Sequence, residues 1–144
     1  MLGAEELTLY PLKRVLIVED DKDMSAFIKY KIESFGTAVC DVAEDPYEAL
    51  DFLSDYSYDF ILMDQKLPGM TGVDVIEEMD KFADKDPVII DSGRFINRKI
   101  PIVFMSADEV DVGTNFHPDH FDLKQIVNKK TQLSTFLKRT FQSA

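Results

Sequence analysis

The chain has 144 residues, 45% of them hydrophobic, and its 27 acidic against 16 basic residues give a net charge of −11 at pH 7. This size suits one globular domain with a single core, and the acidic balance argues against direct binding to nucleic acid, whose phosphates select for basic surfaces. The apolar runs are short, the first segment is unlike a signal peptide, and there is a single cysteine, Cys40. These features predict a cytoplasmic protein without membrane insertion.

Strand-like and helix-like patterns alternate after a leader over residues 1–13. Strands buried on both faces are expected where the chain is continuously apolar, and helices where apolar residues recur every three or four positions. Asp45 adds an N-cap, followed by a proline in the first turn and a capping-box glutamate. The expected strands are 15–18, 37–42, 59–63, 101–105 and about 123–127, and the expected helices cover about 24–35, 46–56, 73–83 and 131–141.

Polar residues follow four of these apolar runs directly. Glu19 and Asp20 come after the first strand, Asp64 after the third, Ser106 after the fourth and Lys129 just beyond the fifth. Repeated strand–helix units with right-handed crossovers build a doubly wound parallel sheet, in which the carboxyl ends of the strands meet at one edge. Three carboxylates, a hydroxyl and a lysine are therefore expected to share one crevice.

Four segments carry a resemblance to response-regulator receiver domains of two-component signalling. They are Val18-Glu19-Asp20-Asp21, Met63-Asp64-Gln65-Lys66-Leu67-Pro68-Gly69-Met70-Thr71-Gly72, Met105-Ser106-Ala107, and Lys129. The resemblance covers about residues 14–141. It implies an α/β, flavodoxin-like fold with a five-stranded parallel sheet in the order 2-1-3-4-5, and a receiver domain over 14–144 with an insertion around 84–100.

The resemblance also implies what each polar residue does. A carboxylate that attacks phosphorus must approach an anionic donor, so a hard cation is needed to offset the repulsion. Asp64 is expected to accept the phosphoryl group, while Ser106 donates a hydrogen bond to a phosphoryl oxygen and Lys129 pairs with another. The expected Mg²⁺ ligands are Glu19, Asp20, Asp64 and the backbone carbonyl of Lys66.

A receiver of this kind would take its phosphoryl group from a histidine kinase or a histidine phosphotransfer protein. It would act as a phosphoacceptor rather than an enzyme, and would signal by contact with an unidentified downstream protein. We expect a stand-alone receiver, whose leader packs on the domain or mediates self-association into a homodimer.

Several alternatives stand beside this interpretation. Asp20 or Asp21 could simply cap the first helix, although capping leaves a matching Asp64 unexplained. Ser92 follows a proline at the same distance as Ser106 does, but its run would bury Asp91, and an unpaired buried carboxylate is costly. Ser106 is therefore favoured. A phosphohydrolase of the haloacid dehalogenase type needs an aspartate at the position of Lys66.

The segment 108–122 and the strand expected at about 123–127 depart from the receiver pattern. Residues 108–122 show poor helical periodicity, Ile126 stands where receivers usually carry a switch aromatic, and Lys130 replaces a proline. The insertion around 84–100 contains a basic cluster. These departures leave two alternatives open. One is a pseudo-receiver, which is an interaction module that uses the fold without phosphorylation. The other is a receiver whose readout runs through the insertion or the 108–122 segment.

Overall fold

The computed structural model describes residues 12–85, 99–107 and 116–142. Residues 1–11, 86–98, 108–115 and 143–144 lie outside these ranges, and with them most of the predicted insertion, including Ser92. In chain order the elements are β1 (Lys13–Val18), α2 (Lys22–Ser34), β2 (Ala38–Ala43), α3 (Pro46–Asp55), β3 (Phe60–Asp64), β4 (Lys66–Leu67), β5 (Met70–Thr71), α4 (Gly72–Lys85), β6 (Ile100–Ser106), β7 (Phe121–Asn128) and α6 (Leu133–Phe141).

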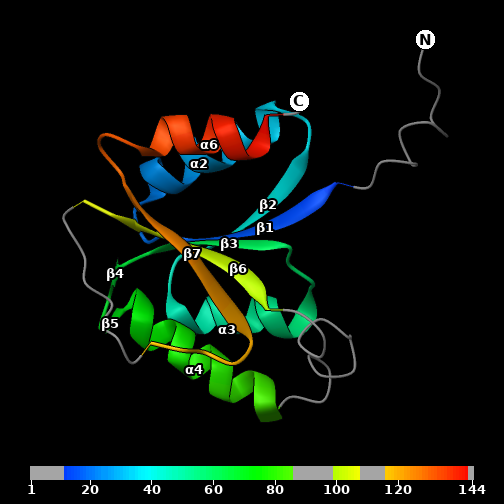
Figure 1. Ribbon diagram of the computed structural model, residues 1–144, viewed down its shortest axis with the longest axis vertical. Helices are drawn as coiled ribbons and strands as arrows, with labels where there is room; N and C mark the ends of the chain where they lie inside the picture. The colour runs from blue at the N-terminus through cyan, green and yellow to red at the C-terminus, as the bar shows by residue number, and fades with distance from the viewer. Residues whose placement is uncertain (1–11, 86–98, 108–115, 143–144) are drawn as a thin grey trace, which may run out of the picture.

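The five long strands form one sheet in the order β2-β1-β3-β6-β7, with every pair parallel. Helices α2 and α6 cover one face of the sheet, and α3 and α4 cover the other (Figure 1). The predicted doubly wound fold and its strand order are confirmed. No helix within the described ranges has the length and apolar character needed to cross a bilayer.

The core consists of two layers, one on each side of the sheet. In β1, Leu16 and Val18 pack in the layer beneath α3 and α4, whereas Val15 and Ile17 pack in the layer beneath α2 and α6. All four side chains are fully buried, because successive residues of a strand point to opposite faces. A continuous apolar run is what such a strand requires.

Short polar segments fix where the helices begin. Asp45 caps α3 by accepting a hydrogen bond from the Glu48 amide at 2.8 Å, and Pro46 is the first helical residue. The predicted cap is confirmed. The side chain of Asp21 caps α2 by accepting from the Asp23 and Met24 amides at 2.9 and 3.1 Å.

The segment after Asp64 forms a short hairpin. Strands β4 and β5 pair antiparallel, with Pro68 and Gly69 between them, and Gly69 has a φ of +80°. A proline followed by a glycine with positive φ is typical of a type II turn. The last strand extends beyond the predicted 123–127, and residues 116–120 contain no helix.

Candidate functional site

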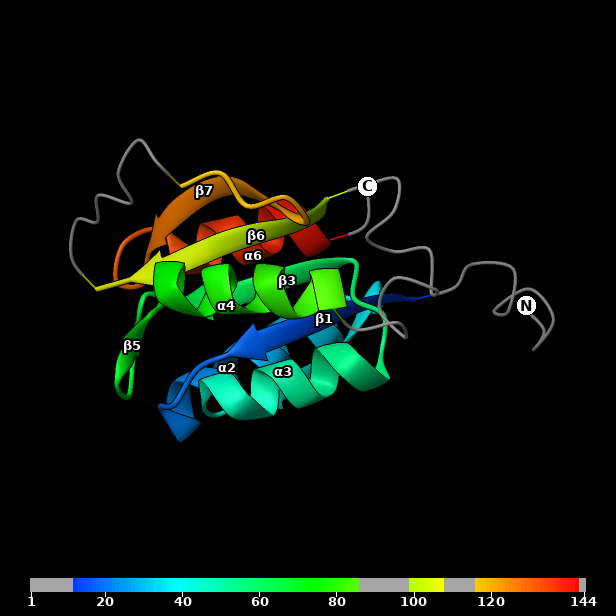
Figure 2. The same ribbon diagram turned by 90° about the horizontal axis from the view of Figure 1, so that it is seen from below.

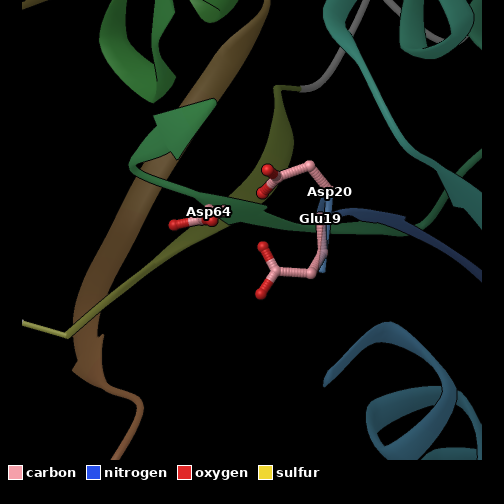
Figure 3. A group of neighbouring side chains, drawn as sticks. All are labelled: Glu19, Asp20 and Asp64. Carbon is pink, nitrogen blue, oxygen red and sulfur yellow. The ribbon is translucent and has the colours of Figure 1, made fainter. Parts of the chain in front are cut away.

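The acidic residues predicted to meet do lie together at the carboxyl ends of two adjacent strands. Glu19 and Asp20 follow β1, and Asp64 ends β3; each offers a carboxylate oxygen within 4.8 Å of the others. Figure 3 shows these three side chains gathered where the strands end. Parallel pairing of β1 with β3 brings them together, because it aligns the ends of the two strands.

The two neighbouring aspartates after β1 have different roles. Asp21 caps α2, whereas Asp20 is exposed and contributes its carboxylate to the acidic group. The alternative that helix capping accounts for the acids after β1 therefore holds for Asp21 and not for Asp20.

Lys129 is the cation of the pocket. Its Nζ lies 2.6 Å from Glu19 Oε1 and 3.1 Å from Asp64 Oδ2. The residue is held in place through its backbone, since its amide donates to the carbonyl of Ser106 at 2.8 Å. The end of β7 thus places the Lys129 ammonium group beside Glu19, which follows β1, and Asp64, which ends β3.

Ser106 ends β6, the strand next to β3, and is 3% exposed. Asp64 is in register with Met105, so Ser106 lies one residue further toward the carboxyl edge of the sheet than the register partner of Asp64. The Lys66 amide donates to Asp64 Oδ1 at 3.1 Å, which orients the carboxylate. The predicted residues on β1, β3, β6 and β7 therefore all lie at the same edge.

Burial makes the charges in this pocket strongly interdependent. Glu19 is completely buried, and burial together with the nearby Asp64 carboxylate raises its pKa to about 8, against the opposing effect of Lys129. Burial acts to lower the pKa of Lys129, but hydrogen bonds to Glu19 and Asp64 outweigh it and the pKa is raised. A pocket with three carboxylates and one ammonium group favours additional positive charge.

The donor set fits a divalent cation that prefers oxygen ligands. Carboxylate oxygens are the ligands that Mg²⁺ takes, usually together with several waters. Glu19 Oε2 is buried and has no hydrogen-bond partner among the described residues, and an oxygen of this kind is normally satisfied by a donor, a water or an ion. The residues present therefore suit Mg²⁺.

Two residues close to Asp64 were not predicted as part of the site. Gln65 is 8% exposed, and its Oε1 also lacks a hydrogen-bond partner within the described ranges. The Gly72 amide donates to the Gln65 carbonyl at 2.9 Å, so the first residue of α4 lies directly against the pocket. Gly72, the last residue of the Met63–Gly72 motif, was the available sequence signal for this close approach.

Comparison with known proteins identifies the class to which this fold and pocket belong. Residues 15–140 match the family described as the response regulator receiver domain, and the chain belongs to this family. Receiver domains of two-component systems signal through phosphorylation and bind Mg²⁺ at an acidic pocket.

Individual relatives agree with this assignment. The cell cycle response regulator CtrA of Brucella ovis is 35% identical over 109 residues, which are 74% of this chain and 45% of that relative. The chain thus matches less than half the length of this curated relative.

Solved structures share the fold. A co-crystal structure of the Saccharomyces cerevisiae histidine phosphotransfer signaling protein Ypd1 with the receiver domain of its downstream response regulator Ssk1 matches with a TM-score of 0.66 and 21% identity, covering 90% of this chain and 87% of that one. The response regulator protein TrrA of Thermotoga maritima in complex with Mg(2+)-BeF matches with a TM-score of 0.61 and 21% identity, covering 89% and 96%.

Proposed function

We propose that this receiver accepts a phosphoryl group on Asp64 in a Mg²⁺-dependent reaction and that the modification switches its protein–protein contacts. The observation that carries the proposal is the juxtaposition of Glu19, Asp20 and Asp64 with Lys129, which contacts two of them. A purely structural cluster would not need three carboxylates around one largely buried ammonium group, because their mutual repulsion opposes folding.

The roles follow from charge and position. Glu19, Asp20, Asp64 and the Lys66 carbonyl would hold the Mg²⁺ ion. Bound there, the ion would offset the repulsion between the acceptor carboxylate and an anionic phosphoryl donor. An oxygen of Asp64 would form the new bond to phosphorus as the bond between phosphorus and the donor breaks.

Lys129 and Ser106 would stabilise the transferred group. The ammonium group of Lys129 already lies 3.1 Å from Asp64 Oδ2 and would turn to a phosphoryl oxygen. The Ser106 hydroxyl, at the end of the strand adjacent to β3, would donate a hydrogen bond to a second one. Donors fixed where negative charge develops lower the barrier without further reorganisation.

The donor we propose is a phosphohistidine of a kinase or of a histidine phosphotransfer protein. The fold that this chain shares with the chain in the Ypd1–Ssk1 co-crystal supports a donor of that class. The exchange would occur in the cytoplasm, and the receiver would act as a phosphoacceptor rather than as an enzyme that releases a product. Its downstream target would be another protein.

A second candidate function is a phosphorylation-independent interaction module. Ile126 favours it, because this residue packs partly buried against the core beside Phe104, where a receiver would use an aromatic switch. The complete acidic pocket favours the phosphoacceptor. The two functions differ in whether occupancy of the pocket changes the rest of the domain.

Beryllium fluoride, which imitates a phosphoryl group on a carboxylate, tests this difference. With Mg²⁺ present it should raise the melting temperature of the protein and shift amide signals beyond the pocket. Asp64→Asn should abolish both effects, while Asp51→Asn, on an exposed position of α3, should retain them. If neither beryllium fluoride nor Mg²⁺ alters the protein, the pseudo-receiver replaces the phosphoacceptor.

A further inference from the structure

The two helical layers of this molecule carry opposite charge. Helix α3 contains three acidic and no basic residues, and α4 contains five acidic and two basic ones. On the other face of the sheet, α2 has three basic and two acidic residues, and α6 has two basic and no acidic ones. The negative charge of the molecule is therefore concentrated on the layer formed by α3 and α4, which lie side by side in Figure 2.

An apolar groove lies within this acidic layer. It is a hollow of about 180 Å³ between α3, α4 and the short strand β5. The groove residues are Pro46, Tyr47, Leu50, Met70, Val75 and Glu78.

The composition of the groove differs from that of an ordinary solvated helix surface. Tyr47 is 76% exposed, and the partly buried side chains of Leu50 and Met70 line the hollow beside it. Tyrosine is a common anchor of protein interfaces because it offers a large rigid contact area and a polar tip. The volume falls below the roughly 300–1,000 Å³ of small-molecule pockets, so it suits one anchoring side chain.

We propose that this groove docks a basic segment of a partner protein that inserts one aromatic or aliphatic side chain between α3 and α4. Charge complementarity identifies the partner: carboxylates on both helices would attract lysine or arginine and repel acidic chains. Glu78 lines the groove itself, and its ion pair with Lys81, at 3.6 Å, is exposed and therefore weak. The proposal goes beyond phosphorylation, because none of the groove residues belongs to the acidic pocket.

A synthetic peptide tests the proposal with the full chain. The probe is a short peptide of alternating lysine and serine with one central phenylalanine, and its affinity is measured by fluorescence anisotropy. Tyr47→Ala should weaken binding about tenfold, as for a central interface tyrosine, and Glu78→Gln about threefold. Tyr30→Ala is the matched control, because Tyr30 is 74% exposed on α2 in the opposite layer; it should leave affinity unchanged.

The probe's own controls separate charge from anchoring. Replacing its lysines with glutamates should abolish binding, replacing its phenylalanine with serine should weaken it, and about 1 M salt should weaken it because the Debye length falls to about 3 Å. Equal affinity for wild type and Tyr47→Ala, or amide shifts confined to α2 and α6, would overturn the proposal. A dimer abolished by Tyr47→Ala would assign the groove to a second copy of this chain instead.

Discussion

Lys129 forms ion pairs with Glu19 and Asp64. The burial of these three side chains determines how much Lys129 contributes to the stability of the pocket. Its side chain is 14% exposed, that of Glu19 is fully buried and that of Asp64 is 9% exposed. Removing one partner of such a group leaves the others poorly satisfied, which is more damaging than the net value of the pair suggests. The pocket therefore depends on Lys129 before any phosphoryl group arrives.

Lys129→Met should lower the free energy of unfolding by about 2 kcal/mol in the presence of a chelator, because hydrogen bonds to two carboxyl groups are lost. It should also slow phosphorylation of Asp64 about a hundredfold, as removal of a fixed charge-stabilising donor does. Urea unfolding and timed intact-mass measurements would check the two effects. Lys130→Met, at the exposed neighbouring position, should change neither; a phosphorylation rate unaffected by Lys129→Met would exclude this residue from phosphoryl binding.

The raised pKa of Glu19 predicts how stability depends on pH without metal. In the unfolded chain the carboxyl group loses its proton near 4.5, but in the folded protein only near about 8, so the folded state binds more protons between these values. The contribution of Glu19 is therefore complete below about pH 4.5 and is lost as the pH rises through about 8, with an upper bound of about 5 kcal/mol.

Glu19→Gln should remove this pH dependence, because an amide does not titrate. In chelator-treated samples, wild type should lose stability between pH 6 and pH 8.5 by an amount that the variant does not share, as measured by the midpoint of urea unfolding. Parallel profiles for the two proteins would show that the buried carboxyl group is already ionised at neutral pH.

At the level of elements, the first residue of α4, Gly72, lies unusually close to Asp64 and Gln65. A Cβ added at Gly72 would lie 2.6 Å from Gln65 Oε1, 2.9 Å from a ring carbon of Phe104 and 3.1 Å from the Asp64 carbonyl oxygen. Phe104 in turn packs against Phe116, with ring centroids 5.9 Å apart. The start of α4 thus lies against both Asp64, the proposed acceptor, and the aromatic pair in the core.

Gly72→Ala should move the start of α4 away from Asp64 and lower the free energy of unfolding by about 1–3 kcal/mol, the usual effect of overpacking. Phosphorylation should slow as well, because Asp64 and Gln65 would shift with the backbone. Gly69→Ala is the informative control: its φ of +80° makes alanine strained, but no atom of the described ranges lies within 4 Å of the added carbon. It should cost about 1 kcal/mol without affecting phosphorylation; equal effects from both variants would point to backbone strain alone.

Across the whole molecule, the fold was largely predictable because its strands are buried on both faces. Continuous apolar runs such as 15–18 and 101–105 have few other interpretations, and Asp45 with Pro46 marked a helix start that α3 confirms. The limits of the last strand were less accurate. Within β7, Asp122, Lys124 and Gln125 are polar and at most half-buried, so the edge of the sheet extends past the apolar pattern.

The pocket was predictable to a similar degree, for a related reason. Residues placed directly after buried strands must meet at one edge, so the meeting of Glu19, Asp20, Asp64 and Lys129 follows from chain order. The different roles of Asp20 and Asp21 depend on the geometry of a helix end. The burial of the Gln65 amide oxygen without a hydrogen-bond partner among the described residues depends on packing. Neither leaves a periodic trace in the sequence.

The most direct test of the phosphoacceptor proposal is the intact mass of the protein after incubation with Mg²⁺ and a small phosphodonor such as acetyl phosphate. We predict the addition of a single phosphoryl group, absent from Asp64→Asn and absent when a chelator removes the metal. An unchanged mass in the wild-type protein, or an adduct of equal yield on Asp64→Asn, would contradict the assignment of Asp64 as the phosphorylated residue.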